Sequence, residues 1–420
     1  MEAKILNKTS KSIKIEIEVP ISKSMLKTEE DIQKALNLAG TKITAYALST
    51  FDTDGKPIEK GKMKFTSKGK VSKKYQTPYG EIELLRHVYQ SSKGGITFCP
   101  LDNSARIIVG STPKFSKQVS SKYSETGGKR VQVDLEENHG RYISRSYIQD
   151  IGNEVASGLI EKREKWNYTL PVSKEAVKSI GASLDGTCMI LAQEGYREAM
   201  VGTIALYNAA GERLYTQYTA TAPEYGKETF FNTFTDELNL ISQYYPDTKM
   251  IGIADGAKEN WTFLEEYTTE QILDYYHATE YISLASDCIF RSKSKKAEWT
   301  GNMRHKLKHE KNGAKEILNE FELHERKRMS DKKRKDLDRC ITYFKNHMHQ
   351  MNYPDYIKLN YPIGSGVVEA ACKVIIKQRL CNSGMKWKRE GAGNVLKLRC
   401  LNYSDTKWSQ SWEKIDRYGL

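Results

Sequence analysis

The stretch that decides the fold is Tyr361–Trp387, which reads YPIGSGVVEAACKVIIKQRLCNSGMKW. Its Pro, Gly and Ser residues break the chain and supply a helix start, with Ser365 as the expected N-cap. We expect a helix to follow over residues 367–380, with Glu369 in its first turn. Lys373 and Lys377 follow Glu369 at i+4 and i+8, so a regular helix places all three on one face. This pattern predicts either an ordinary surface Glu–Lys pair or a catalytic carboxylate beside a basic ridge.

Two further carboxylates end apolar runs and are each followed by glycine. Asp185 ends the run in GASLDGTCMI, and Asp255 ends the predicted strand Met250–Ala254 in KMIGIADGAKENW. If these strands are neighbours, both carboxylates point toward one edge of a sheet. With Glu369 added, three negative charges in one place require cations, and carboxylate oxygens suit a pair of Mg²⁺ ions. Two such metals serve phosphodiester cleavage and strand transfer.

Together, these motifs resemble the DDE transposases of bacterial insertion sequences, specifically the ISKra-type group. The resemblance rests on SLDGT, IADGAKENW, DYYHATEY and PIGSGVVEAACK…KQRL…SGMKW, and it covers about residues 75–412. It implies that Asp185, Asp255 and Glu369 are the catalytic, metal-binding carboxylates. It also marks Asp274 and His277 in DYYHATEY as a supporting D-x-x-H pair, for which an ordinary buried His is the alternative.

The same resemblance implies the activity and its partners. Such an enzyme binds the terminal inverted repeats of an insertion sequence and catalyses Mg²⁺-dependent cleavage and strand transfer, with Mn²⁺ able to replace Mg²⁺. The expected partners are double-stranded DNA at the transposon ends and target, and further copies of the chain in a homodimer or larger synaptic complex. The expected compartment is the bacterial cytoplasm, at the nucleoid.

Composition is consistent with this interpretation. The formal net charge of the 420-residue chain is +13 and its pI is near 9.1, which favours a polyanionic partner. Neither a signal-peptide core nor a membrane span is evident. The seven cysteines are scattered without a C-x-x-C pair, which argues for a reducing compartment and against a disulfide framework. Some relatives carry paired cysteines near Cys99, but one stands alone here, so we expect no zinc.

The region before the core predicts a DNA-binding module. Helices are expected over residues 113–125, 130–138 and 144–156, with His139-Gly140-Arg141 as a turn, which is typical of a helix-turn-helix. Two groups of contacts follow: Ser144, Arg145, Ser146 and Gln149 toward the major groove, and Arg141 and Tyr142 on phosphates. An ordinary trihelical packing module is the alternative.

We therefore expect an α/β chain with a ribonuclease-H-like catalytic core, built on a mixed five-stranded sheet with helices. The expected order of elements in the core is β-β-β-α-β-α-β-α. The last strand is expected over residues 271–276.

Embedded apolar residues in the charged segment after the core's first part indicate an all-helical insertion. We expect a β-containing α+β region over residues 1–111, which is a candidate for binding DNA ends, and the helix-turn-helix module over residues 112–165. The first part of the core is expected over residues 166–290, the insertion over 291–360, and the last part of the core with a C-terminal segment over 361–420. Residues 60–74, rich in Lys, Gly and Ser, are expected to form a mobile basic connection.

Further DNA contacts are expected around the carboxylates. Lys373, Lys377 and Arg379 would grip phosphates and make binding depend on salt. Lys258, Trp261 and Trp387 are further candidates near the scissile strand. Two other functions remain open: a metal-dependent nuclease of the same fold, and a DNA-binding protein derived from a transposase.

Overall fold

The structure is a computed structural model that describes residues 2–9, 11–61, 63–91, 93–162, 165–327, 329–382 and 384–420. The chain divides into two compact units. The first contains Met1–Thr169, Lys397–Asn402 and Thr406–Leu420, and the second contains Leu170–Leu396 and Tyr403–Asp405. In the described part of the chain, no helix has the length and apolar character needed to cross a membrane.

The second unit is built on the predicted mixed five-stranded sheet. Its strands are β6 (Ser179–Leu191), β7 (Gly195–Tyr207), β8 (Arg213–Thr221), β9 (Lys249–Ala254) and β10 (Glu270–Leu273). Their order across the sheet is β10-β9-β6-β7-β8. The first three strands form antiparallel pairs, whereas β9 runs parallel to both β6 and β10. With α6 (Glu228–Tyr244), α7 (Lys258–Leu264) and α8 (Tyr275–Ile289), the element order is the expected one. The last strand is shorter than predicted, since α8 begins where the strand was expected to continue.

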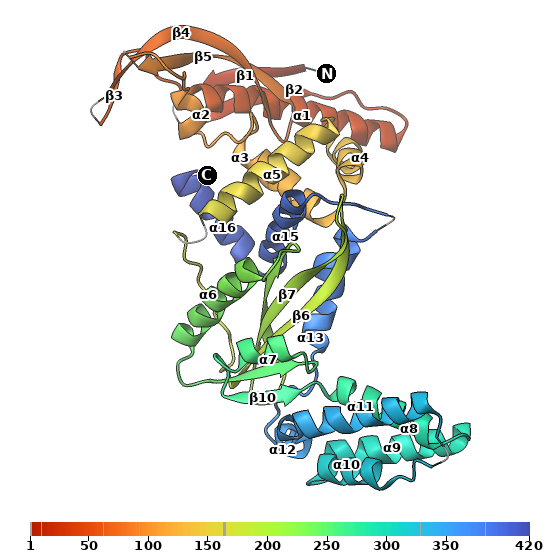
Figure 1. Cartoon of the computed structure of the whole chain (residues 1–420). Helices are drawn as coiled ribbons and strands as arrows, with labels where there is room; N and C mark the ends of the chain where they lie inside the picture. The colour runs from red at the N-terminus through yellow and green to blue at the C-terminus, as the bar shows by residue number, and fades with distance from the viewer. Residues whose placement is uncertain are drawn as a thin grey trace. The chain divides into compact units, whose positions relative to one another are not determined.

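Helices cover the two faces of this sheet (Figure 1). Gly202 of β7 faces α6 so closely that an added Cβ would lie 2.7 Å from the Phe234 ring. Residues paired across antiparallel strands share a face, and successive residues alternate. Because Gly202 pairs with Leu184, the next residue along β6, Asp185, points to the opposite face. That face carries α13 (Gly366–Ala371) and the π-helical segment η2 (Cys372–Lys377), whose Cys372 contacts Asp185.

The charged segment between β10 and α13 is helical, as expected. It contains α9 (Lys293–His309), α10 (Gly313–Leu323), α11 (Asp331–His347), the short η1 (Met348–Gln350) and α12 (Tyr353–Lys358). Its core is formed by the apolar residues that have helical spacing: Ile317, Leu318, Phe321, Leu337, Ile341 and Phe344, all buried. The bundle includes α8, which packs against α9 and α11. The helical part therefore begins earlier than the predicted boundary at residue 291.

The first unit combines small antiparallel sheets with helices. It begins with β1 (Glu2–Lys8), β2 (Ile13–Glu18) and α1 (Met25–Ser49), followed by a sheet of β3 (Ile58–Lys60), β4 (Met63–Gln76) and β5 (Glu81–Ser91). The expectation of a mobile connection over residues 60–74 is wrong for its described residues, because 63–74 lie within β4, which pairs with β3 and β5. Most lysines of this strand are exposed, so their long side chains stay solvated while the backbone forms a ladder.

Three helices complete the first unit together with the chain's C-terminal part. They are α3 (Pro113–Glu125), α4 (Gly128–His139) and α5 (Arg145–Glu161), close to the predicted ranges, and they pack on one another. Gly140 ends α4 in the left-handed conformation, which glycine adopts without strain. The first unit also contains the short α2 (Pro100–Ser104) and α16 (Thr406–Tyr418), which buries Trp412 and Ile415. In the second unit, the short α14 (Gln378–Leu380) follows η2, and α15 (Arg389–Tyr403) contributes residues to both units.

Candidate active site

Asp185 lies within β6 and does not end it. The strand continues for six more residues to Leu191, because β7 supplies hydrogen-bonding partners over this whole length. The parallel ladder with β9, in contrast, ends where Ser183 pairs with Ile253. Asp185 therefore stands just beyond the end of the parallel ladder, on a strand that its antiparallel neighbour keeps extended. The sequence interpretation was wrong about the strand end, but the carboxylate still lies at the edge of the parallel part of the sheet.

Asp255 follows the last residue of β9, at the same edge. Its Oδ1 accepts a hydrogen bond from the Ala257 backbone N–H (3.1 Å), and its own carbonyl accepts one from the Tyr343 hydroxyl (2.8 Å). Gly256, with φ of +104°, makes the turn that this arrangement needs. The Tyr343 bond attaches this turn to α11, so the helical insertion fixes the backbone that carries Asp255.

Glu369 is brought to the sheet by α13, which begins after Ser365. Ser365 is the N-cap by position, but its hydroxyl makes no capping bond and lies 3.0 Å from Glu369 Oε1. Two residues beyond Glu369 the helix widens into η2, which replaces the regular helix we expected. Such π-helical segments are frequent at functional sites. Because η2 has more residues per turn, Lys373 and Lys377 do not keep the strict i, i+4 alignment with Glu369.

The three carboxylates share one electrostatic environment. The pKa of Asp185 is raised, chiefly because burial disfavours its charged form, and also by the charges of Asp255 and Glu369. The Gly186 backbone N–H (2.7 Å) and the Cys372 thiol (3.5 Å) donate to Asp185 and oppose that shift. Burial and the neighbouring Asp185 raise the pKa of Cys372 in turn, so this thiol stays protonated. Among the described residues, no three His, Cys, Asp or Glu side chains come together as a complete metal site.

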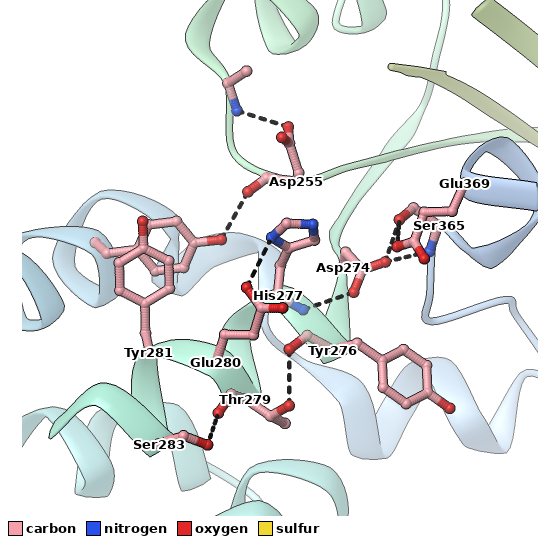
Figure 2. Close-up of polar contacts among 12 residues, drawn as sticks. Asp255, Asp274, Tyr276, His277, Thr279, Glu280, Tyr281, Ser283, Ser365 and Glu369 are labelled. Atoms are coloured by element: carbon pink, nitrogen blue, oxygen red, sulfur yellow. Dashed lines mark hydrogen bonds and ion pairs between the residues drawn. The ribbon is translucent and has the colours of Figure 1, made fainter. Parts of the chain in front are cut away.

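Asp274 and His277 take different places. Asp274 is fully buried at the N-terminus of α8, where its Oδ1 accepts from the His277 backbone N–H (2.9 Å). Its Oδ2 accepts from the backbone N–H and hydroxyl of Ser365 (Figure 2). The His277 ring is partly exposed, with Nδ1 3.7 Å from a Glu280 oxygen. The alternative of an ordinary buried histidine is therefore wrong, since the aspartate is the buried member of the pair.

A cavity of about 600 Å³ opens beside Asp255. His277, Glu280 and Tyr281 line it from α8 and belong to the DYYHATEY motif, in which His277 had been singled out. Leu284 of α8 and Arg339 and Tyr343 of α11 also line it, and no motif had indicated them. The rings of Tyr281 and Tyr343 stack with centroids 3.6 Å apart, and the Arg339 guanidinium lies over the Tyr281 ring. Arg339 is exposed and forms no ion pair with any described carboxylate. Only tertiary packing brings Arg339 and Tyr343 beside the motif, so no local sequence signal could have found these two residues.

The expected DNA contacts near the carboxylates divide into exposed and buried residues. Lys258, Lys373 and Lys377 are exposed. The prediction is wrong for Trp261 and Arg379, which are buried, whereas Trp387 is half-buried and its DNA contact stays a prediction. Trp261 is 5% exposed within the core, and Arg379 is 2% exposed with its guanidinium over the Trp387 ring. Trp387 donates its indole N–H to Leu380 (2.9 Å), and its backbone pairs with β6.

The residues of the first unit that were predicted to contact DNA are likewise partly exposed and partly buried. Tyr142, Ser144, Arg145, Ser146 and Gln149 are exposed around the start of α5. Tyr142 and Ser144 line a cavity of about 620 Å³ together with two lysines of β4. Arg141, which we expected on a phosphate, is instead buried. Its guanidinium donates to the Thr77 carbonyl (3.0 Å) and to Gln76 Oε1 (2.6 Å), so it serves the fold of this unit.

No protein-family model matches this chain, and neither does any curated protein. The donor set at the sheet edge consists of carboxylate oxygens, which are the ligands that suit a hard divalent cation. Burial, together with repulsion by the other two carboxylates, raises the pKa of Asp185. A bound cation would offset that repulsion.

Proposed function

We propose that this chain is a DDE transposase of the ISKra type, with a ribonuclease-H-like catalytic core. The observation that carries the proposal is the grouping of Asp185, Asp255 and Glu369 near one edge of a mixed sheet, close enough for the charges of the other two to raise the pKa of Asp185. Carboxylates from separate elements that repel one another are costly to the fold, and a cation-dependent reaction explains why they are kept.

In this proposal, Asp185, Asp255 and Glu369 hold two Mg²⁺ ions. When bound, these ions activate an attacking oxygen and stabilise a leaving oxygen in phosphodiester chemistry. The chain's own residues fix the geometry: β6 and β9 hold the two aspartates, and Tyr343 holds the turn that carries Asp255. No side chain needs to form a covalent intermediate, because positioning supplies most of the catalysis.

DNA binding would draw on both units. The exposed Lys258, Lys373 and Lys377 supply cations around the carboxylates, and Arg339 adds one from the helical insertion. In the first unit, α3, α4 and α5 would act as the helix-turn-helix module, with Arg145, Ser146 and Gln149 toward the major groove. Because two transposon ends must be joined in one complex, we infer a homodimer or larger assembly.

The deciding experiment is a cleavage assay with Mg²⁺ on labelled DNA that carries the element's own ends. It compares the wild type with Asp185→Asn and Glu369→Gln, which keep side-chain size but remove a charge. We expect the wild type to nick at the element ends, and both variants to bind the DNA without cutting. Cutting by Asp185→Asn would overturn the assignment. Cutting by the wild type without preference for the ends would favour a nuclease, and binding without cutting would favour a DNA-binding derivative.

A further inference from the structure

A fourth carboxylate, Asp274, stands at the same edge of the sheet as the proposed catalytic set. The parallel ladder of β10 and β9 pairs Leu273 with Ala254, an offset of 273 − 254 = 19. Asp274 and Asp255 follow these residues with the same offset, 274 − 255 = 19. The backbone N–H of Asp274 still donates to Ala254 (2.9 Å), so the ladder extends to it. The first residues after β9 and β10 are thus both aspartates, and they stand level.

The surroundings of Asp274 differ from those of a metal ligand. Its exposed fraction is 0%, and both carboxylate oxygens already accept hydrogen bonds. All of the donors are neutral: the His277 N–H at the start of the 15-residue helix α8, and the N–H and hydroxyl of Ser365. These donors come from the N-terminus of α8 and from the segment before α13, so both carboxylate oxygens are used in joining the two elements. Asp274 therefore has the bonding of an anchor and no open side toward a cation.

The hydroxyl of Ser365 connects this anchor to Glu369. Ser365 Oγ contacts Asp274 Oδ2 on one side and lies 3.0 Å from Glu369 Oε1 on the other, as Figure 2 shows. A hydroxyl has one proton to donate, so the two carboxylates compete for it. In this structure the hydroxyl lies between the two carboxylates, and its contact with Asp274 is the shorter one. Ser365 is 4% exposed, and the bond from its backbone N–H to Asp274 keeps it in place.

The glycine before Ser365 permits this close approach. An added Cβ at Gly364 would lie 3.1 Å from the Tyr276 ring and 3.8 Å from Asp274 Oδ2. Glycine therefore lets the segment before α13 lie directly against the start of α8. Asp274 and Ser365, which are 91 positions apart in the chain, meet here, and the Ser365 hydroxyl links the carboxylates of Asp274 and Glu369.

We propose that Asp274 and Ser365 are positioning residues that orient Glu369 for cation binding. This inference rests on the proposed function, since it takes Glu369 as a cation ligand. Outer partners that orient a metal-binding side chain change metal affinity or activity by about 10–100-fold when they are removed. Ser365 and Asp274 act through Glu369, so their loss changes how well it is held without removing any ligand oxygen.

The test measures Mn²⁺ binding to the full chain without DNA, by following the electron paramagnetic resonance signal of free Mn²⁺. Ser365→Ala should bind Mn²⁺ about 10-fold more weakly than the wild type, and should need correspondingly more Mn²⁺ for half-maximal cleavage. Ser365→Thr keeps the hydroxyl and should restore both values to within about 3-fold. The matched control is Ser283→Ala: this serine lies on α8 and donates to Thr279 (2.9 Å), away from Glu369, so its loss should leave Mn²⁺ binding unchanged.

Thermal unfolding of each variant separates positioning from a general loss of structure. If Ser365→Ala does not fold, Ser365→Cys retains the side-chain size with a much weaker donor and should show the same direction of change. Unchanged Mn²⁺ binding in the folded variants would overturn the inference while leaving the transposase proposal intact. A wild type that binds Mn²⁺ more tightly than Ser365→Ala but never cuts DNA would support the positioning role and overturn the proposed function. A wild type that binds no Mn²⁺ would overturn both.

Discussion

The distance along the chain from Asp185 to Asp255 equals the distance along the chain between residues paired across β6 and β9. The carboxylates are 255 − 185 = 70 positions apart, and the ladder of β6 and β9 pairs Ser183 with Ile253, which are 253 − 183 = 70 apart. Continued by two residues, this register brings the two aspartates level at one edge of the sheet. The two carboxylates therefore lie at the same end of the parallel ladder, and the charge of Asp255 contributes to the raised pKa of Asp185 after the larger effect of burial.

The position of Asp185 near Asp255 and Glu369 leads to a prediction about the stability of the chain in the absence of metal. The pKa of Asp185 is raised in the folded chain, so ionisation of Asp185 costs the folded state free energy. The cost is absent below the ordinary pKa of an aspartate and complete once the pH exceeds the raised value. Asp185→Asn should therefore be more stable than the wild type at pH 7 in EDTA, by about 1 kcal/mol or 2–4 °C in Tm.

The pH dependence is the control for that prediction. The difference in Tm should shrink as the pH falls from 7 toward 4, because the wild-type carboxyl then takes up its proton. Added Mg²⁺ should raise the Tm of the wild type more than that of Asp185→Asn, since a cation stabilises the charged form. A variant less stable than the wild type at pH 7 in EDTA would show that burial of the Asp185 charge, with its repulsion by Asp255 and Glu369, is not the dominant effect.

The turn after Asp255 predicts a site where the smallest substitution is costly. Gly256 has φ of +104°, and an added Cβ would lie 3.0 Å from the Tyr343 ring and 3.2 Å from His347. Gly256→Ala combines backbone strain with a clash, so we expect a loss of about 2 kcal/mol in the free energy of unfolding, measured by urea denaturation. Gly301→Ala is the matched control. Gly301 lies in helix α9 with open space around it, so alanine there should stabilise by about 0.5–1 kcal/mol. Equal effects of the two substitutions would contradict the strained turn.

The order of elements in the second unit could be read from the sequence because its signals are local. Apolar runs bounded by glycine predict β8 and β9, and the phenylalanines at helical spacing predict α6. The position of Asp185 inside β6 could not be read in this way. The residues after it are kept extended by pairing with β7, and this pairing depends on the partner strand and not on the residues around Asp185.

Arg339 illustrates a part of the site that no motif marks, and it predicts a specific effect on DNA binding. Its guanidinium lies over Tyr281 in the cavity beside Asp255 and donates one long hydrogen bond to the Tyr281 hydroxyl (3.5 Å), which leaves further N–H groups to meet a phosphate. Arg339→Ala should weaken binding of the element's end several-fold, and should reduce the slope of log affinity against log salt by about 1. The measurement is fluorescence anisotropy at several salt concentrations.

Arg334→Ala is the comparison for Arg339. It lies on the same helix and has the same charge, but its guanidinium is paired with Asp331 (2.9 Å). Its loss should change the salt slope much less. If the two variants weaken DNA binding equally, then Arg339 acts only through net charge, and the cavity beside Asp255 does not lie along the bound strand.

The two arginines and the tryptophan that were predicted wrongly share one physical cause. A sequence shows that Arg141, Arg379 and Trp261 can bind nucleic acid, but not that the fold buries them, with Trp261 packed in the apolar core. The two acceptors of Arg141 lie more than 60 positions earlier, in and just after β4. Burial of an arginine is stable only when such acceptors are present, so the outcome depends on tertiary structure and not on local pattern.

Neighbouring arginines in the first unit should therefore respond in opposite ways to the same substitution. Arg141→Ala removes both hydrogen bonds and the stacking over Phe115, leaving a buried carbonyl without its donor. We expect a loss of about 2–4 kcal/mol in the free energy of unfolding, with DNA affinity little changed in the molecules that remain folded. Arg145→Ala, at the exposed start of α5, should change stability by less than about 0.5 kcal/mol but weaken DNA binding. Denaturation and fluorescence anisotropy on the same two proteins test this prediction. If Arg141→Ala is as stable as the wild type but binds DNA more weakly, then Arg141 belongs to the DNA interface, because the fold does not need its guanidinium and leaves it available for a phosphate.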